Sequence, residues 1–66
     1  MKYTIVIEPA EEGGFTAYVP ALRGCVAEGE TEAEVLENIK EAIRDYIEVL
    51  EEITKGKRTF EIEVAA

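Results

Sequence analysis

Residues 18–36 constrain the fold more than any other part of the chain, because they combine a strand end, a turn and a helix start. Pro20 has no backbone N–H to donate to a sheet, so the extended run before it is predicted to end there. Gly24 permits a reversal with positive φ, after which Cys25 to Glu28 are predicted to form a short return strand. Gly29 then breaks that strand.

A capping box follows, since Glu34 lies three residues after Thr31. This pattern predicts a helix from Glu32 to about Thr54, with Gly56 just beyond its end. The stretch therefore predicts the order strand, loop, strand, helix. Its motif residues are Pro20, Gly24, Cys25, Gly29, Thr31 and Glu34.

Three other runs are typical of strands. Residues 3–7 and 15–19 are rich in β-branched and aromatic side chains, and a loop with two glycines separates them at hairpin distance. Residues 57–64 alternate between Phe60, Ile62 and Val64 on one face and polar residues on the other. We predict one α+β domain over residues 1–66, with element order β-β-β-α-β and the helix packed on one face of the sheet.

The predicted sheet order is 3-2-1-4. The third strand is short, which suits a sheet edge, and the first strand is apolar on both faces, which suits a central position. The fourth strand is therefore expected beside the first.

The chain is so short that the stability given by its core alone would be marginal. At 66 residues it buries roughly 60% of the surface exposed by the unfolded chain. A single cysteine excludes an internal disulfide, and the absence of histidine disfavours a zinc site. We expect a homo-oligomer, either a dimer or a tetramer.

The helix predicted above is roughly 35 Å long, whereas five-residue strands span about 17 Å. Its apolar residues beyond the sheet, together with the sheet face opposite the helix, are therefore candidate subunit contacts. The candidate interface residues are Val6, Tyr18, Val49 and Ile53.

The net charge of −8 disfavours direct nucleic-acid binding, which depends on clusters of lysine and arginine. A basic protein partner fits the charge, although an acid excess that only keeps the protein soluble is the commoner explanation. No apolar run reaches the roughly 20 residues that a membrane span needs. The apolar run at the N-terminus is too short for a signal peptide, because it ends at the acidic residue Glu8. We expect a cytoplasmic protein.

The sequence offers little for catalysis. Histidine, the commonest general base, is absent, and Cys25 is interpreted as a small buried hydrophobic residue. Glu8, Glu61 and Glu63 would converge if their strands were neighbours, and paired carboxylates can hold Mg²⁺. These carboxylates also fit the polar side of amphipathic strands, so we predict no catalytic residue, metal or cofactor, and no enzymatic activity.

The segment Tyr18-Val19-Pro20-Ala21-Leu22-Arg23-Gly24-Cys25, followed by Glu28-Gly29-Glu30-Thr31, resembles the HicB-like antitoxin family. The likeness extends to the early strand, the Gly13-Gly14 hairpin and residues 38–42. It implies a partial RNase H-like fold and a protein that neutralises a small basic HicA-type ribonuclease toxin by covering its RNA-binding and catalytic surface. Here Thr31 is followed by Glu-Ala-Glu-Val-Leu, where the family favours two acids, alanine and leucine.

Many family members also carry a C-terminal DNA-binding domain, which is not expected in a chain that ends at Ala66. The candidate partner-binding residues lie on the acidic face of the helix and in the loop of residues 20–24. They are Glu37, Glu41, Asp45 and Glu48 on the helix, with Leu22 and Arg23 in the loop. Two alternatives remain: a metal-dependent RNase H-like nuclease, and a structural homo-oligomer with no toxin partner.

Overall fold

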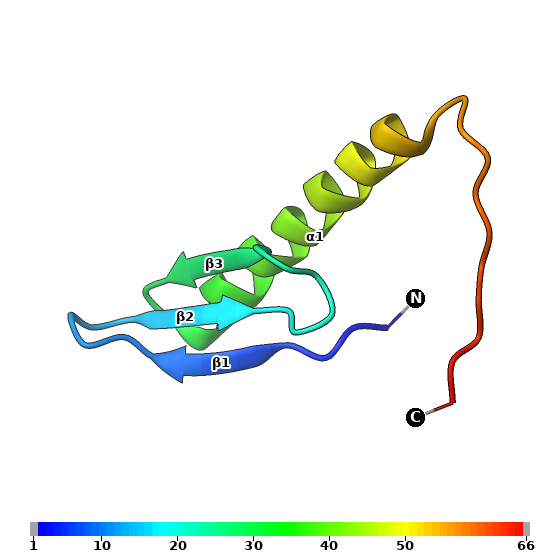
Figure 1. The fold of residues 1–66 in the computed structure, drawn as a ribbon. Coiled ribbons are helices and arrows are strands. Elements are labelled where there is room, and N and C mark those ends of the chain that lie inside the picture. The colour runs from blue at the N-terminus through cyan, green and yellow to red at the C-terminus, as the bar shows by residue number, and fades with distance from the viewer. Residues whose placement is uncertain (1, 66) are drawn as a thin grey trace.

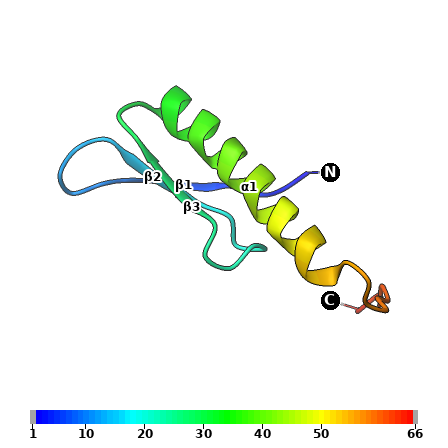
Figure 2. The same ribbon diagram turned by 90° about the horizontal axis from the view of Figure 1, so that it is seen from above.

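Three antiparallel strands and one long helix form the fold in the computed structural model, which describes residues 2–65 (Figure 1). The elements follow the order β1 (Val6–Pro9), β2 (Phe15–Tyr18), β3 (Val26–Gly29) and α1 (Glu32–Thr54). The helix crosses one face of the sheet, as the view from above shows (Figure 2). The predicted α+β class, the three antiparallel strands and the bounds of the helix are confirmed.

The first strand is shifted along the chain relative to the prediction for residues 3–7. β1 runs from Val6 to Pro9 because Val6 pairs with Tyr18 and Pro9 pairs with Phe15. β2 ends at Tyr18, one residue earlier than expected, so the residues before Val6 have no strand opposite them. The hairpin closes through Ala10, whose N–H donates to the carbonyl of Gly14 at 3.0 Å.

The third strand also starts and ends one residue later than predicted, at Val26 and Gly29. It pairs with β2 so that Val26 lies opposite Tyr18, which itself lies opposite Val6. Val6, Tyr18 and Val26 therefore form an apolar row across the sheet. Two of the predicted interface residues are thus neighbours on one sheet face.

The core lies between the sheet and the first half of the helix. Its buried side chains are Ala17, Val19, Cys25, Val35 and Ile39. The longest dimension of the chain is 44 Å, and the second half of the helix extends beyond the strands (Figure 1). Val49, Leu50 and Ile53 on that half are exposed, Val49 by 57%.

The C-terminal segment, residues 57–65, is where the structure departs most from the predicted fold. The chain reverses at Gly56 (φ 75°), and the N–H of Lys57 donates to the carbonyl of Thr54 at 2.9 Å. The segment then runs extended and apart from the sheet, whose order within residues 2–65 is β1-β2-β3 (Figure 1). The predicted strand over residues 57–64 is not formed in this single chain, and the order 3-2-1-4 is not confirmed.

The turn that leads into the segment lies away from the sheet. α1 continues past the strands to Thr54, and after Gly56 the chain runs extended without pairing with β1. Its three apolar side chains remain in solvent, with Phe60 76%, Ile62 82% and Val64 80% exposed.

Candidate protein-binding surfaces

The start of α1 is fixed by side-chain hydrogen bonds. The Oγ1 atom of Thr31 accepts from the N–H of Glu34 at 3.1 Å, and the Oε1 atom of Glu34 accepts from the N–H of Glu30 at 3.1 Å. This is the predicted capping box with one difference. The Glu34 side chain accepts from the N–H of Glu30, the residue before the N-cap, and not from the N–H of the N-cap Thr31 itself. Asn38 then donates from Nδ2 to the carbonyl of Glu28 at 2.7 Å, which ties the helix to β3. The rotation of the helix about its axis is therefore set.

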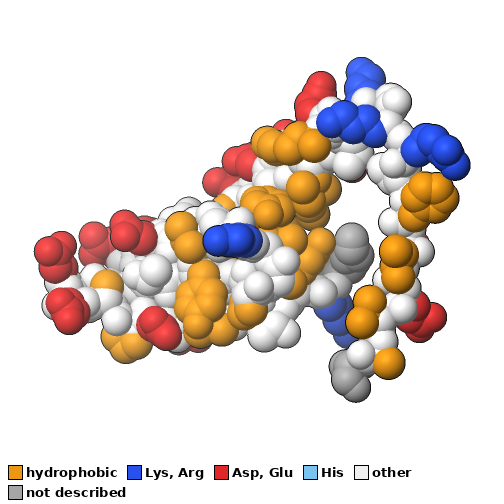
Figure 3. Space-filling model, in the orientation of Figure 1, with side chains coloured by type: hydrophobic (Ala, Val, Ile, Leu, Met, Phe, Trp, Pro, Cys, Tyr) orange, Lys and Arg blue, Asp and Glu red, His pale blue; other side chains and the backbone are white. Residues whose placement is uncertain are grey.

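That rotation turns the predicted acidic residues of the helix toward solvent. The acidic helix face consists of Glu37, Glu41, Asp45 and Glu48, all of them exposed. Spacings of three and four residues place their carboxylates in one row along the helix. Figure 3 shows acidic side chains along the outer edge of the helix and at the hairpin end of the sheet. The structure thus brings the four predicted helix residues together.

The loop of residues 20–24 is held by backbone hydrogen bonds. The N–H of Leu22 donates to the carbonyl of Val19 at 3.0 Å, and the N–H of Cys25 donates to the carbonyl of Leu22 at 3.0 Å. Leu22 is half-buried and packs against the core, whereas Arg23 is exposed. Of the two predicted loop residues, Arg23 is accessible to a partner and Leu22 mainly anchors the loop.

An apolar groove, which we call the β3 groove, joins this loop to the helix. It has a volume of about 320 Å³, and its lining residues are Gly24, Cys25, Val26, Ala42, Asp45, Tyr46 and Val49. Asp45 belongs both to this groove and to the acidic helix face. The sequence pattern did not reveal the groove, because Gly24 and Asp45 meet only through the packing of the helix on β3. The spacing of Ala42 and Val49 by seven residues, two helical turns, was the available signal.

A second apolar groove, the β1 groove, lies on the opposite side of the helix. Its volume is about 380 Å³, and it is lined by Tyr3, Ile5, Leu36, Ile39, Lys40, Ile43, Arg44 and Ile47. Two cations, Lys40 and Arg44, therefore border an otherwise apolar surface. The two grooves differ in charge, since the β3 groove carries an aspartate and the β1 groove carries a lysine and an arginine.

Cys25 is 4% exposed, and burial raises the pKa of its thiol. A raised pKa keeps the sulfur protonated at neutral pH, and the protonated thiol is a poor nucleophile. Cys25 packs in the core with Val19 and Val35. These observations agree with its interpretation as a small hydrophobic residue.

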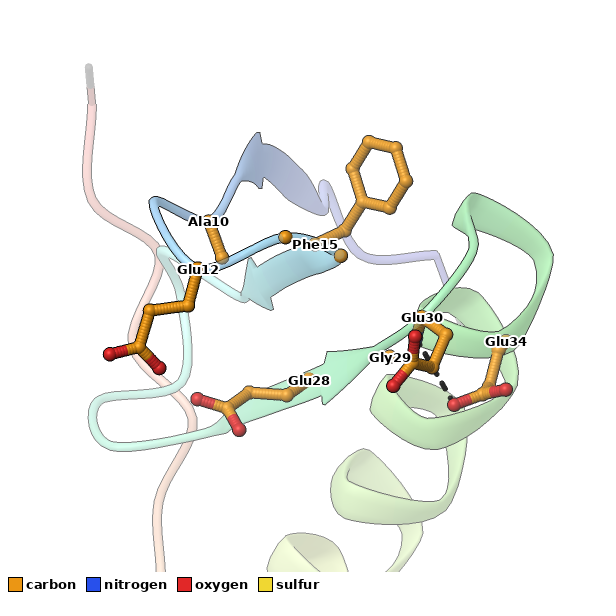
Figure 4. A pocket seen from close by; sticks show the side chains of 9 residues that line it. Ala10, Glu12, Phe15, Glu28, Gly29, Glu30 and Glu34 are labelled. Atoms are coloured by element: carbon orange, nitrogen blue, oxygen red, sulfur yellow. Dashed lines mark hydrogen bonds between the residues drawn. The ribbon is translucent and has the colours of Figure 1, made fainter.

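Four carboxylates surround a third hollow, of about 310 Å³, beside the hairpin (Figure 4). They belong to Glu12, Glu28, Glu30 and Glu34, and the carboxylate of Glu34 accepts a hydrogen bond from the backbone N–H of Glu30. Within residues 2–65, no group of three or more histidine, cysteine, aspartate or glutamate residues is placed to hold a metal ion.

The carboxylates of the nuclease alternative are not assembled either. Glu8 lies in β1, whereas Glu61 and Glu63 lie on the C-terminal segment outside the sheet. In the described part of the chain, α1 is also not apolar enough to cross a membrane.

Comparison with known proteins identifies the family of this chain. Residues 3–65 match the family model for the HicB_like antitoxin of bacterial toxin-antitoxin systems. A UPF0150 protein of Thermoplasma acidophilum is 56% identical over 50 residues, covering 76% of this chain and 72% of that relative. A UPF0150 protein of Archaeoglobus fulgidus is 40% identical over 57 residues, covering 86% and 83%. A UPF0150 protein of Synechocystis is 46% identical over 49 residues, covering 74% and 62%. The chain belongs to the HicB-like antitoxin family.

Proposed function

We propose that this protein is the inhibitory partner of a small basic HicA-type ribonuclease toxin and acts in the cytoplasm by covering the toxin's RNA-binding and catalytic surface. Membership of the antitoxin family supports an antitoxin role. The proposed binding to the basic surface of the toxin rests on the acidic helix face, where four exposed carboxylates lie in one row. A surface that binds RNA phosphates is positively charged, so the same surface attracts such a row.

The docking surface that we propose combines this acidic face with the β3 groove. Stable interfaces usually have an apolar centre and a polar rim. Val26 supplies exposed apolar area in the groove, and Asp45 and the other helix carboxylates supply the rim. The exposed Arg23 precedes Gly24, which lines the groove. The charges steer the encounter, and the groove supplies the area buried on binding.

We further propose that the functional protein is a homo-oligomer and that its sheet has the order 3-2-1-4 of a partial RNase H-like fold. Within the described residues, β1 pairs only with β2, so its outer edge is available to another strand. Residues 60–64 have the alternating pattern of such a strand. The apolar pair of Val6 and Tyr18, and the helix end with Val49 and Ile53, are the proposed subunit contacts.

A direct test is co-expression of this chain with a tagged HicA-type toxin, followed by purification of the toxin. We expect the chain to co-purify, and we expect added RNA to compete with it for the toxin. Failure to co-purify at low salt contradicts the proposal. So does a ternary complex of chain, toxin and RNA, because the proposed mechanism makes the two ligands mutually exclusive.

The structural homo-oligomer is the second candidate, and the exposed apolar end of α1 favours it. It predicts self-association without any affinity for the toxin, so the same purification distinguishes the two. The nuclease alternative predicts that Mg²⁺ raises the thermal stability and supports RNA cleavage by the chain alone.

A further inference from the structure

We propose that the toxin docks by adding an extended segment of its chain to the outer edge of β3, where the segment pairs with the backbone of Val26 and fills the β3 groove. This pairing rests on the proposed function. It specifies the conformation and the side-chain chemistry of the part of the toxin that enters the groove, and charge attraction alone specifies neither.

The outer edge of β3, on the side away from β2, carries backbone groups that no strand within residues 2–65 pairs. The N–H of Val19 donates to the carbonyl of Cys25 at 3.2 Å, so Cys25 directs its backbone groups toward β2. Because successive residues of an antiparallel strand direct these groups to opposite edges, Val26 and Glu28 direct theirs outward. The side chain of Asn38 accordingly reaches the carbonyl of Glu28 from the helix, at 2.7 Å. Both backbone groups of Val26 and the N–H of Glu28 therefore stay open at this edge.

This open edge forms one side of the β3 groove. Gly24 and Val26 line the groove from the sheet, and Ala42 and Tyr46 line it from the helix. A partner that fills the groove therefore also covers the backbone of Val26. Burying N–H and C=O groups without giving them new partners is costly, and a helix cannot supply such partners because its own backbone groups bond to one another. An extended segment supplies both, so the occupant of the groove is expected to be a strand.

The start of the helix limits how far an added strand can pair. Asn38 already occupies the carbonyl of Glu28, and a Cβ atom on Gly29 would stand 2.5 Å from a backbone nitrogen of the first helical turn. The other end of the edge is open, since a Cβ atom on Gly24 would meet no atom within 4 Å. The incoming segment is therefore expected to pair at Val26 and at the N–H of Glu28, and to leave the edge before Gly29.

The two faces of the added strand meet different surroundings, because its side chains alternate between them. Side chains directed at the helix meet Ala42 and the half-buried ring of Tyr46, which favours apolar residues. Side chains on the opposite face lie beside Val26 and the exposed Glu28, which share that face of β3. A lysine or arginine there is placed to pair with the carboxylate of Glu28.

The charge around the edge favours the same basic segment. Glu28 on β3 and Glu41 and Asp45 on the helix are exposed carboxylates, and they stand against the guanidinium of Arg23 in the loop. Asp45 is the charged residue among those that line the groove. The segment is therefore expected to alternate apolar residues with lysine or arginine, which suits a basic toxin.

Hydrogen exchange in the complex with a HicA-type toxin tests the pairing at Val26. In the free chain, the N–H of Val26 is expected to exchange faster than that of Ala27, which faces β2 opposite Ala17. Saturating toxin is expected to slow exchange at Val26 by at least about tenfold. The N–H of Glu12 in the hairpin loop is the control and is expected to keep its rate.

The outcomes separate this pairing from the proposed function. A toxin that binds while the Val26 amide exchanges at its free rate overturns the added strand and leaves the proposed inhibition standing. A toxin that does not bind the chain at all overturns both.

A matched pair of variants tests the backbone contact without relying on exchange. Val26→Pro removes the N–H that faces the open edge, and proline is tolerated on an edge strand when its missing N–H points outward. Val26→Ala, the control, shortens the side chain and keeps the N–H. In calorimetric titration with the toxin, V26P is expected to bind at least about tenfold more weakly than V26A. Equal affinities of the two variants overturn the added strand. Circular dichroism verifies that V26P is folded, and the exchange experiment on the native chain decides the question if it is not.

Discussion

Gly29, the last residue of β3, lies so close to Val35 of α1 that a Cβ atom on Gly29 would stand 2.5 Å from the backbone nitrogen of Val35. The first turn of the helix therefore crosses the end of β3 with no side chain between the two backbones. This contact and the hydrogen bond from Asn38 to the carbonyl of Glu28 fix the angle and rotation of the helix. They thereby determine where the acidic helix face points.

Replacing Gly29 with alanine is expected to destabilise the fold by about 2 kcal/mol, because the helix backbone must move to admit the methyl group. Urea unfolding measures this change. Gly13→Ala is the control: its Cβ meets open space, and only the positive φ of 101° opposes it, at about 1 kcal/mol. A loss for G29A no larger than that for G13A contradicts the close contact.

Thr31→Ala removes the hydroxyl that accepts from the N–H of Glu34. The expected loss in the free energy of unfolding is about 1 kcal/mol, which is typical of an N-cap. Thr59→Ala on the C-terminal segment makes the same chemical change on an exposed residue, and its effect is expected to be within about 0.5 kcal/mol. Equal effects of the two substitutions would show that the cap does not stabilise this helix.

The buried thiol of Cys25 predicts a pH dependence of stability. Burial raises the pKa of the thiol in the folded state, so the unfolded state loses this proton at lower pH. The stability that Cys25 contributes is complete below the unfolded pKa of about 8.5 and declines as the pH rises above it. The difference in unfolding free energy between the native chain and C25A is expected to shrink from about pH 8 to about pH 10. A difference in unfolding free energy that stays constant or grows over this pH range would contradict the prediction.

Reversing two charges on the acidic helix face, with Glu41→Lys and Asp45→Lys, is expected to weaken toxin binding by about tenfold at low salt and by less at high salt. Calorimetric titration at two salt concentrations measures both values. The control is Glu11→Lys with Glu12→Lys in the hairpin loop, which changes the net charge equally but away from the helix. If both pairs weaken binding equally, net charge matters and the helix face does not.

The helix was predictable because its signals are local. Thr31 and Glu34 cap it through hydrogen bonds over three or four residues, and Gly56 reverses the chain just beyond its end. Strand bounds depend on pairing partners that are distant in sequence. The pattern of residues 3–7 indicated a strand, yet β1 begins only at Val6, because β2 ends opposite it at Tyr18.

The same limit applies to the candidate surfaces. The periodicity of the helix predicted that Glu37, Glu41 and Glu48 share a face, but no local pattern shows that Gly24 and Asp45 line one groove. The alternation in residues 57–64 indicates the ability to form a strand and leaves open which edge the strand joins. That choice depends on the free edge of β1 and on the length of α1.

The most direct test of the proposed inhibition is RNA cleavage by the HicA-type toxin, measured while this chain is titrated into the reaction. The proposal predicts that cleavage falls in proportion to added chain, reaches zero when every toxin molecule is bound, and returns toward its starting rate in the helix variant E41K/D45K at low salt. Full RNA cleavage by a toxin that is demonstrably saturated with this chain would contradict it.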